Sequence, residues 1–497
     1  MSYITRVALE NFKSFESTGI DLPGKINLIM GENSSGKSSI IKPILSLKQT
    51  LSQSNEHEAF AANGEYVELG TYNDYIYQHD DKKEIEISIT IEDILSIGSS
   101  LWWISYEEEK KYLDSKKGTF KKEISIRYDK DYKTSQARLK RILLKSHVPP
   151  FGEIEFSLDR MKTRDHFTLN INRSSFEKIK EKYIDYRIES KTINSDDIDK
   201  IRNLDYSLIK KSFRIDKTNR LDLEYKRINI YSEIIDSLSL EIFHLFNEHH
   251  TEMLKKIESN IYYLGPIRSS PLRSYKRTSH NRSIGTNGVH SASVLANLHA
   301  GRSRVEKIKL NTFNLWVDIL FPGTKVNIES YDELVKLKFK KNNSNNLKGE
   351  SIPDVGFGFS QILPFLIQAA VLEDGNILII EQPELHLHPS AQFSLAKVIS
   401  SMAQKGIKLI IETHSEHILR GLQLEISKYR LNNKEGISHE EFNIIYVGKS
   451  DSNKISKVEL NEFGEIVSDW PSGFFDAAYT ATMQILKNKT KNVDGVK

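Results

Sequence analysis

The loop at residues 31–38 constrains this sequence most. It reads Gly-Glu-Asn-Ser-Ser-Gly-Lys-Ser and lies between an apolar run and a helical pattern. In that context a G-x-x-x-x-G-K-[ST] pattern predicts a phosphate-binding loop, because its backbone N–H groups and the next helix N-terminus face an anion. In such a loop the lysine reaches the β- and γ-phosphates and the serine binds Mg²⁺. We therefore expect ATP and Mg²⁺ to be bound here by Gly31, Asn33, Ser34, Ser35, Gly36, Lys37, Ser38 and Ser39.

A second segment, residues 377–384, predicts the metal-binding strand of a nucleotide hydrolase. Four apolar residues end in Glu381, whose carboxylate a buried strand delivers to Mg²⁺ directly or through water. The next position, where a glutamate normally polarises the attacking water, holds Gln382. An amide cannot accept a proton, and general-base help is worth about 10²–10⁴ in rate, so we expect slow hydrolysis. Glu384 is the candidate to replace the missing base.

The glycine-rich segment at residues 354–364 is expected to complete the site from a second copy of the chain. Gly358 exposes backbone, and Ser360 and Gln361 are expected to cap the next helix and to point its N-terminus at the partner's γ-phosphate. A glycine-rich helix start that serves only packing is the alternative.

A histidine after the strand expected at residues 408–411 is placed to sense the γ-phosphate. This residue, His414, follows Ile411-Glu412-Thr413. His414, His386, His388 and His417 could together form a metal cluster. However, all four histidines lie in segments that the expected ATPase site already explains. The catalytic set predicted from the sequence is Lys37, Glu381, Gln382, Glu384 and His414, with Ser38 and Glu381 as metal ligands.

Apolar periodicity places these motifs in an α/β fold interrupted by an insertion. Strands are expected at 3–12, 26–30, 85–91, 377–380 and 408–411, and helices at 37–48, 176–186, 228–257 and 389–402. Residues 340–351 are expected to form an exposed loop. The expected domains are an N-terminal ATPase lobe (1–95), an insertion (96–310), a C-terminal ATPase lobe (311–420) and an accessory domain (421–497).

Two basic stretches stand out in a chain whose net charge is only +3. Residues 110–145 hold 13 Lys/Arg against 4 Asp/Glu, and no acidic residue occurs from 259 to 305. Both are candidate contacts for nucleic acid, the second mainly through arginines between 268 and 304. The second stretch also suits an ordered loop that faces a phosphate or a protein partner. A solvated surface is the alternative for each.

The chain has no cysteine, no signal-peptide-like N-terminus and no apolar run long enough to span a bilayer. We therefore expect a cytoplasmic protein without membrane contact.

With these motifs in place, the chain resembles the SMC/RecF-like ABC ATPases, and more narrowly the ATPase part of the overcoming-lysogenisation-defect nucleases. The resemblance is carried by GENSSGKSS, VGFGFSQILP, IIEQPELHLHP and IIETHSEHIL, and the tail at 459–476 looks like a C-terminal domain of one branch of them. It implies an α/β ABC-type P-loop head built from N- and C-terminal segments, with a mixed, largely helical insertion. It also implies an ATP-sandwiched homodimer or higher homo-oligomer.

Relatives of this shape often belong to anti-phage systems such as Septu, PARIS and retron-linked defence. The leading expectation is therefore an oligomeric scaffold or sensor with a separate effector, expected to be a nuclease. An ATP-gated DNA clamp of RecF type, used in repair or recombination, is the alternative. The ATP-binding subunit of a transporter is disfavoured, because those keep the head nearly continuous.

Overall fold

The computed structural model divides the 497-residue chain into two compact units. The first holds Met1–Leu22 and Ser39–Ile261, and the second holds Pro23–Ser38 and Tyr262–Lys497. The domain boundaries expected at residues 95, 310 and 420 stay predictions. The described residues are 3–52, 59–93, 120–148, 151–161, 166–192, 195–204, 215–216, 233–278, 282–341, 349–432, 435–448 and 455–468.

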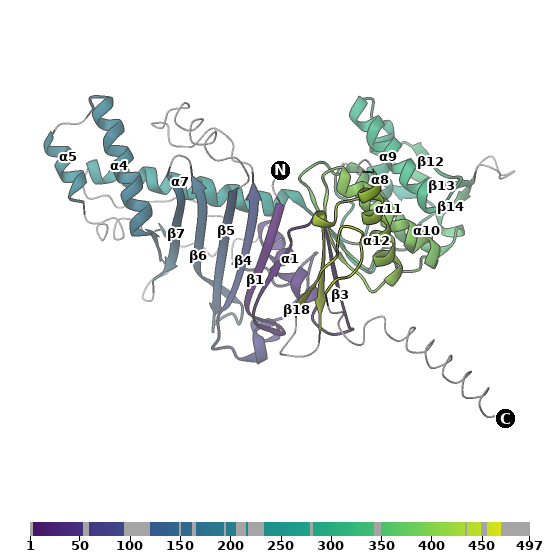
Figure 1. The fold of residues 1–497 in the computed structure, drawn as a ribbon, viewed down its shortest axis with the longest axis horizontal. Coiled ribbons are helices and arrows are strands. Elements are labelled where there is room, and N and C mark those ends of the chain that lie inside the picture. Colours follow the sequence, from purple (N-terminus) through teal and green to yellow (C-terminus); the bar gives the residue numbers. More distant parts are fainter. Residues whose placement is uncertain are drawn as a thin grey trace. The chain divides into compact units, whose positions relative to one another are not determined.

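The first unit is built on an antiparallel sheet that has eight strands within the described residues, in the order β2-β1-β4-β5-β6-β7-β8-β9 (Figure 1). These are β1 (Tyr3–Phe12), β2 (Phe15–Asp21), β4 (Ile85–Asp93), β5 (Phe120–Lys130), β6 (Ala137–Val148), β7 (Gly152–Arg160), β8 (His166–Ile171) and β9 (Ile215–Asp216). Buried and partly exposed residues alternate along β6, as expected of a sheet with one covered face.

The helices of the first unit include one long helix that packs on this sheet. Helix α7 (Glu233–Asn260) contacts β5 and β6. The others are α1 (Ser38–Ser52), whose first residue belongs to the second unit, α2 (Tyr72–Tyr75), α4 (Arg173–Glu189) and α5 (Ser195–Arg202). The expected strands at 3–12 and 85–91 and the helices at 37–48 and 176–186 are confirmed, as is the described part of the helix at 228–257. The insertion is mixed as expected, and β5 to β8 extend the N-terminal sheet, which no sequence signal had located.

The second unit contains a six-stranded sheet within the described residues, in the order β10-β15-β16-β3-β17-β18. Its strands are β3 (Ile26–Gly31), β10 (Ile261–Leu264), β15 (Ile377–Glu381), β16 (Lys408–Glu412), β17 (Phe442–Val447) and β18 (Ile455–Val458). Strands β15, β16, β3 and β17 run parallel, and every residue of each is buried. This burial identifies a sheet covered on both faces. The carboxyl ends of parallel strands share one edge, where open α/β sheets bind ligands.

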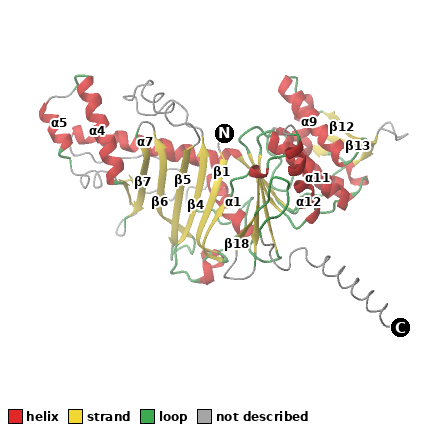
Figure 2. Cartoon of the chain, viewed as in Figure 1, coloured by secondary structure: helices red, strands yellow, loops and turns green. Residues whose placement is uncertain are grey.

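Helices cover this sheet, and a smaller sheet packs with them (Figure 2). The helices are α8 (Ser291–Ala300), α9 (Arg304–Leu320), α10 (Phe357–Val371), α11 (Pro389–Gln404) and α12 (Glu416–Leu431), and the small sheet holds β11 (Tyr275–Lys276), β12 (Thr324–Tyr331), β13 (Leu334–Lys341) and β14 (Glu350–Ser351). The loop expected at 340–351 is therefore shorter, because β13 and β14 take its two ends; residues 342–348 lie outside the described residues. Among the described helices, none is both long and apolar enough to cross a bilayer.

Candidate nucleotide-binding site

The loop at residues 31–38 follows β3 directly and leads into α1, as the sequence predicts. Its backbone takes conformations that few residues tolerate: φ is 146° at Gly31, 61° at Ser34 and 100° at Gly36. A Cβ on Gly31 would collide with the carbonyl oxygen of Val447 on the neighbouring strand β17. Glycine is therefore required where the loop leaves the sheet.

Lys37 lies inside this loop with 4% of its surface exposed. Its ammonium donates hydrogen bonds to the carbonyl oxygens of Gly31, at 3.1 Å, and of Glu32. Ser35 is also buried, whereas Asn33 and Ser34 are exposed at the tip. Ser39 lies in the first turn of α1. A buried lysine in a loop that joins a parallel strand to a helix N-terminus has the arrangement of a phosphate-binding site.

Two glutamates end neighbouring parallel strands at the carboxyl edge of the sheet. Glu381 closes β15, Glu412 closes β16, and the two are direct register partners. The Ser38 hydroxyl donates to Glu412, with Oε2 at 3.0 Å and Oε1 at 3.3 Å. The Glu381 carboxylate instead accepts a hydrogen bond of 2.8 Å from the hydroxyl of Tyr263. Ser38 and Glu381 as the Mg²⁺ ligands stay a prediction, but the hydroxyl and carboxylate oxygens gathered at this edge fit a hard divalent cation.

Sequence reasoning missed Glu412, although its signal was present. The run Lys408–Glu412 ends a buried apolar strand in a glutamate, as Ile377–Glu381 does. Only the pairing of β16 with β3 shows that Glu412 ends beside the loop that carries Ser38.

The basic segment after residue 259 supplies two further site residues. Burial, and after it the carboxylates of Glu381 and Glu412, raise the pKa of Tyr263 far above its ordinary value. Arg268 is 6% exposed and donates to the carbonyl oxygens of Glu381, at 3.0 Å, and Gln382, at 3.3 Å. Burial lowers the pKa of Arg268 to about 10, with Glu384 opposing the shift, so the guanidinium stays charged at neutral pH.

Gln382 is fixed through its backbone. Its φ of 47° is unusual for a residue with a side chain, and its N–H donates to the carbonyl oxygen of Glu412 at 2.7 Å. With Arg268 on its own carbonyl, the residue is held from both sides. The amide side chain therefore stands at a position that the fold specifies closely.

Glu384 and His414, two residues of the predicted catalytic set, are brought together. The Glu384 carboxylate is 9% exposed and accepts a 2.8 Å hydrogen bond from the backbone N–H of His414. Burial raises the pKa of Glu384, while burial and the charge of Lys37 lower the pKa of His414. His414 is therefore neutral at physiological pH and retains one N–H donor.

The glycine-rich segment departs from expectation at its helix start. Helix α10 begins at Phe357 with Gly356 as its N-cap, so the prediction that Ser360 and Gln361 cap this helix is wrong. Both lie within the helix and are buried, at 6% and 5% exposure, and the Ser360 hydroxyl donates to the carbonyl of Phe357. Gly356 holds the capping position with φ −51° and ψ 139°, a conformation that other residues also adopt. Contact of Ser360 or Gln361 with a partner's nucleotide stays a prediction.

The surface at this helix start is formed by other residues. Phe357 is 52% exposed and packs edge-on against the ring of His386, with centroids 4.7 Å apart. Gly358 approaches the His386 carbonyl so closely that a Cβ would collide with it. Gly358, His386 and His388 line a groove of about 460 Å³ beside them. Within the described part of the chain, no group of three or more His, Cys, Asp or Glu is arranged to hold a metal ion.

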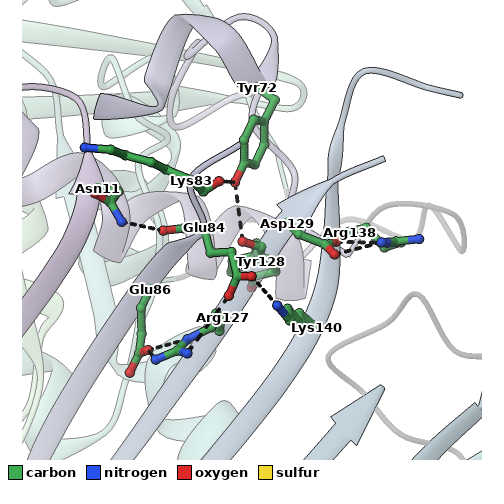
Figure 3. A network of polar contacts seen from close by, with 10 residues as sticks. All are labelled: Asn11, Tyr72, Lys83, Glu84, Glu86, Arg127, Tyr128, Asp129, Arg138 and Lys140. Atoms are coloured by element: carbon green, nitrogen blue, oxygen red, sulfur yellow. Dashed lines mark hydrogen bonds and ion pairs between the residues drawn. The ribbon is translucent and has the colours of Figure 1, made fainter. Parts of the chain in front are cut away.

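Basic residues of the first stretch form ion pairs where the structure describes it, and Figure 3 shows those of Arg127, Arg138 and Lys140. Residues 110–119 lie outside the described residues, and the remainder falls in β5 and β6. Its ion pairs there are Lys122–Glu252, Arg127–Glu86, Lys130–Asp81, Arg138–Asp129, Lys140–Glu84 and Arg141–Asp159. Five of these six acidic partners lie outside residues 110–145, so a count of charges within the stretch does not include them.

The second basic stretch is divided among different roles. Arg268 is buried at the site, and Arg273 makes two 2.7 Å hydrogen bonds to the carboxylate of Asp354. Arg277 donates to the side chain of Asn297. Arg282, Arg302 and Arg304 are exposed.

A buried-lysine phosphate loop, a carboxylate-bearing edge and a histidine beside them, on a parallel α/β sheet, define a P-loop ATPase. The family model of the AAA ATPase domain matches residues 3–419. The chain therefore belongs to this family of ATP-binding and ATP-hydrolysing enzymes. A search of curated proteins finds no significant match.

Solved structures of SMC head domains are distantly similar. An Smc head bound to the C-winged helix domain of ScpA shows 13% identity and a TM-score of 0.38, covering 92% of this chain and 98% of that chain. The Smc head of Pyrococcus furiosus with an extended coiled coil, bound to the C-terminal domain of ScpA, shows 12% identity, a TM-score of 0.36 and coverage of 99% and 100%. The SMC head domain from Thermotoga maritima shows 10% identity and a TM-score of 0.33, covering 92% of this chain and 99% of that chain.

Proposed function

We propose that this ATPase is a slowly hydrolysing scaffold or sensor that self-associates around ATP and Mg²⁺ and serves an anti-phage defence complex with a separate effector, expected to be a nuclease. Lys37 and the loop at 31–38 hold the phosphates, and Ser38 and Glu381 hold the ion. The ion, when bound, neutralises charge on the phosphates and polarises the bond to be broken. His414 contacts the γ-phosphate as a neutral donor.

The placement of Gln382 carries the proposal of slow turnover. The residue follows the carboxylate that ends β15, and two hydrogen bonds to its backbone fix it there. With an amide at the usual place of the general base, the site should hydrolyse ATP slowly and keep it bound for longer. Glu384 is the residue proposed to replace the missing base. Its carboxylate accepts a hydrogen bond from the backbone N–H of His414, which supports a role in linking the end of β15 to the histidine.

Self-association is supported by the surface at the start of α10. The exposed Phe357 ring, the His386 ring packed on it and the adjoining groove present an apolar and aromatic surface to solvent. Aromatic residues are enriched in the centres of protein interfaces. A second copy that closes over the nucleotide would cover this surface. The separate effector and the defence role rest on the resemblance of the four sequence segments to ATPases of such systems.

The DNA-clamp alternative receives less support from the charges. Ion pairs with acids outside residues 110–145 leave less net positive charge along β5 and β6 than the sequence count suggests. Arg268 and Arg273 are also engaged within the second unit. A clamp would bind duplex DNA with an affinity that falls steeply as salt rises, by close to one log unit per log of salt for each neutralised phosphate.

The variant Gln382→Glu tests the proposed slow turnover. It should raise the steady-state rate of phosphate release by at least about tenfold, since it restores a group that can accept a proton. Lys37→Ala is the control and should abolish ATP binding. Fast turnover in the wild type that Gln382→Glu leaves unchanged would contradict the proposal.

Co-purification tests the scaffold and its effector. The chain should be expressed with its neighbouring genes, purified with ATP and weighed by native mass spectrometry. In the wild-type sample with ATP, we expect a complex of two or more copies of the chain with another protein that has nuclease or toxic activity. The Lys37→Ala variant should not form this complex. A monomer in both samples would exclude the scaffold, and tight salt-sensitive DNA binding by that monomer would favour the clamp.

A further inference from the structure

Glu412 and Glu381 form a pair of carboxylates at the edge where the nucleotide loop begins. They are register partners on parallel strands, so their side chains emerge on the same face of strands that lie about 4.8 Å apart. Both are nearly buried, at 5% and 9% exposure. The pair is therefore a feature of the sheet itself and not of a mobile loop.

Each carboxylate accepts a hydrogen bond from a hydroxyl group at this edge. Glu412 accepts from Ser38 at 3.0 Å, and Glu381 accepts from Tyr263 at 2.8 Å. As register partners at the ends of β15 and β16, the two carboxylates lie at the same edge of the sheet. We call Ser38, Tyr263, Glu381 and Glu412 the edge cluster.

The edge cluster has the donor set that Mg²⁺ takes with a nucleotide. Two carboxylates held side by side repel each other, and a divalent cation between them removes that cost. Mg²⁺ in nucleotide sites is held by one or two carboxylates together with phosphate oxygens and water. Among the described residues no cluster of three or more carboxylates or histidines exists, so the cation needs the phosphates to complete its shell.

We propose that Glu412 is a second carboxylate ligand, direct or through water, of the Mg²⁺ that enters with ATP, beside Ser38 and Glu381. This inference rests on the proposed nucleotide site and adds to it a residue that the loop and strand motifs do not include. Glu412 supplies a second negative charge beside Glu381 from the neighbouring strand. It also holds the Ser38 hydroxyl at the edge before the ion arrives.

The variant Glu412→Gln separates a metal ligand from a structural partner. Glutamine keeps an oxygen that accepts the Ser38 hydrogen bond but removes the charge. Mn²⁺ serves as the probe, with a non-hydrolysable ATP analogue present, and free Mn²⁺ is measured by electron paramagnetic resonance. We expect Mn²⁺ affinity to fall at least about tenfold in Glu412→Gln, as losses in metal shells typically do. Analogue binding in EDTA should be unchanged. Glu416→Gln, on the exposed first turn of α12, is the matched control and should bind Mn²⁺ as the wild type does.

Thermal unfolding gives a second readout. Without metal, Glu412→Gln should melt at a higher temperature than the wild type, because the repulsion from Glu381 is gone, and the rise on adding Mn²⁺ and analogue should shrink. Wild-type Mn²⁺ affinity together with a lowered melting temperature would overturn the proposal and leave Glu412 as a partner of Ser38 alone. A wild type that binds no analogue, with or without Mn²⁺, would instead overturn the nucleotide site on which the inference rests.

Discussion

Two buried histidines on helix α7 predict that the first unit loses stability as the pH falls from 7 to 5. His250 is 1% exposed and stacks on Phe246, with ring centroids 5.3 Å apart and an interplanar angle of 14°. His249 is 8% exposed, and its Nδ1 lies 2.9 Å from the Ser146 hydroxyl. Burial lowers the pKa of each to about 4, and the charge of Lys122 adds to the shift at His249.

The size of the effect follows from the difference between the folded and unfolded states. The unfolded chain protonates a histidine near pH 6.5, whereas the folded chain does so near pH 4. Between these values the unfolded state binds more protons, so the free energy of unfolding falls as the pH falls. At pH 5 each histidine has lost roughly 2 kcal/mol relative to pH 7, and the two together roughly 4 kcal/mol. The contribution is complete above pH 6.5.

Hydrogen exchange of α7, followed by mass spectrometry at both pH values and corrected for intrinsic rates, measures this loss in the region concerned. The variant His250→Leu carries no proton at that position and should reduce the pH dependence by about 2 kcal/mol. His244→Leu, at an exposed position of the same helix, is the control and should leave it unchanged. Protection of α7 that is equal at pH 5 and pH 7, or a His250 pKa near 6.5 by NMR, would refute the reasoning.

Two further substitutions test the site. Gly31→Ala should abolish binding of a fluorescent ATP analogue and lower the melting temperature, because the new Cβ would collide with the Val447 carbonyl at a φ of 146°. Gly356→Ala is the control and should change the melting temperature little, because a Cβ there meets nothing within 4 Å. Equal behaviour of the two variants would contradict this geometry. Tyr263→Phe removes the hydrogen bond to Glu381 and should lower the free energy of unfolding in denaturant by about 1–3 kcal/mol. It should also slow phosphate release. An unchanged unfolding midpoint together with an unchanged rate of phosphate release would show that the contact is dispensable.

The sequence by itself determined the local parts of this protein. The pattern at residues 31–38 identified the phosphate loop, and apolar runs located strands β3, β15 and β16, because a buried parallel strand needs an unbroken apolar stretch. Glu384 and His414 were both chosen from their spacing to these strands, and the structure joins them by a hydrogen bond.

Only the tertiary structure decided which distant residues meet. The order of the strands places Glu412 beside Ser38, 374 positions earlier in the chain, and brings Tyr263 and Arg268 to the end of β15. It also pairs basic residues of β5 and β6 with acids that come from strands, a turn and helix α7. Helix α10 begins at Phe357, three residues before Ser360, so Ser360 lies inside the helix and does not cap it. Register and strand order depend on packing over the whole sheet, which no local pattern of residues encodes.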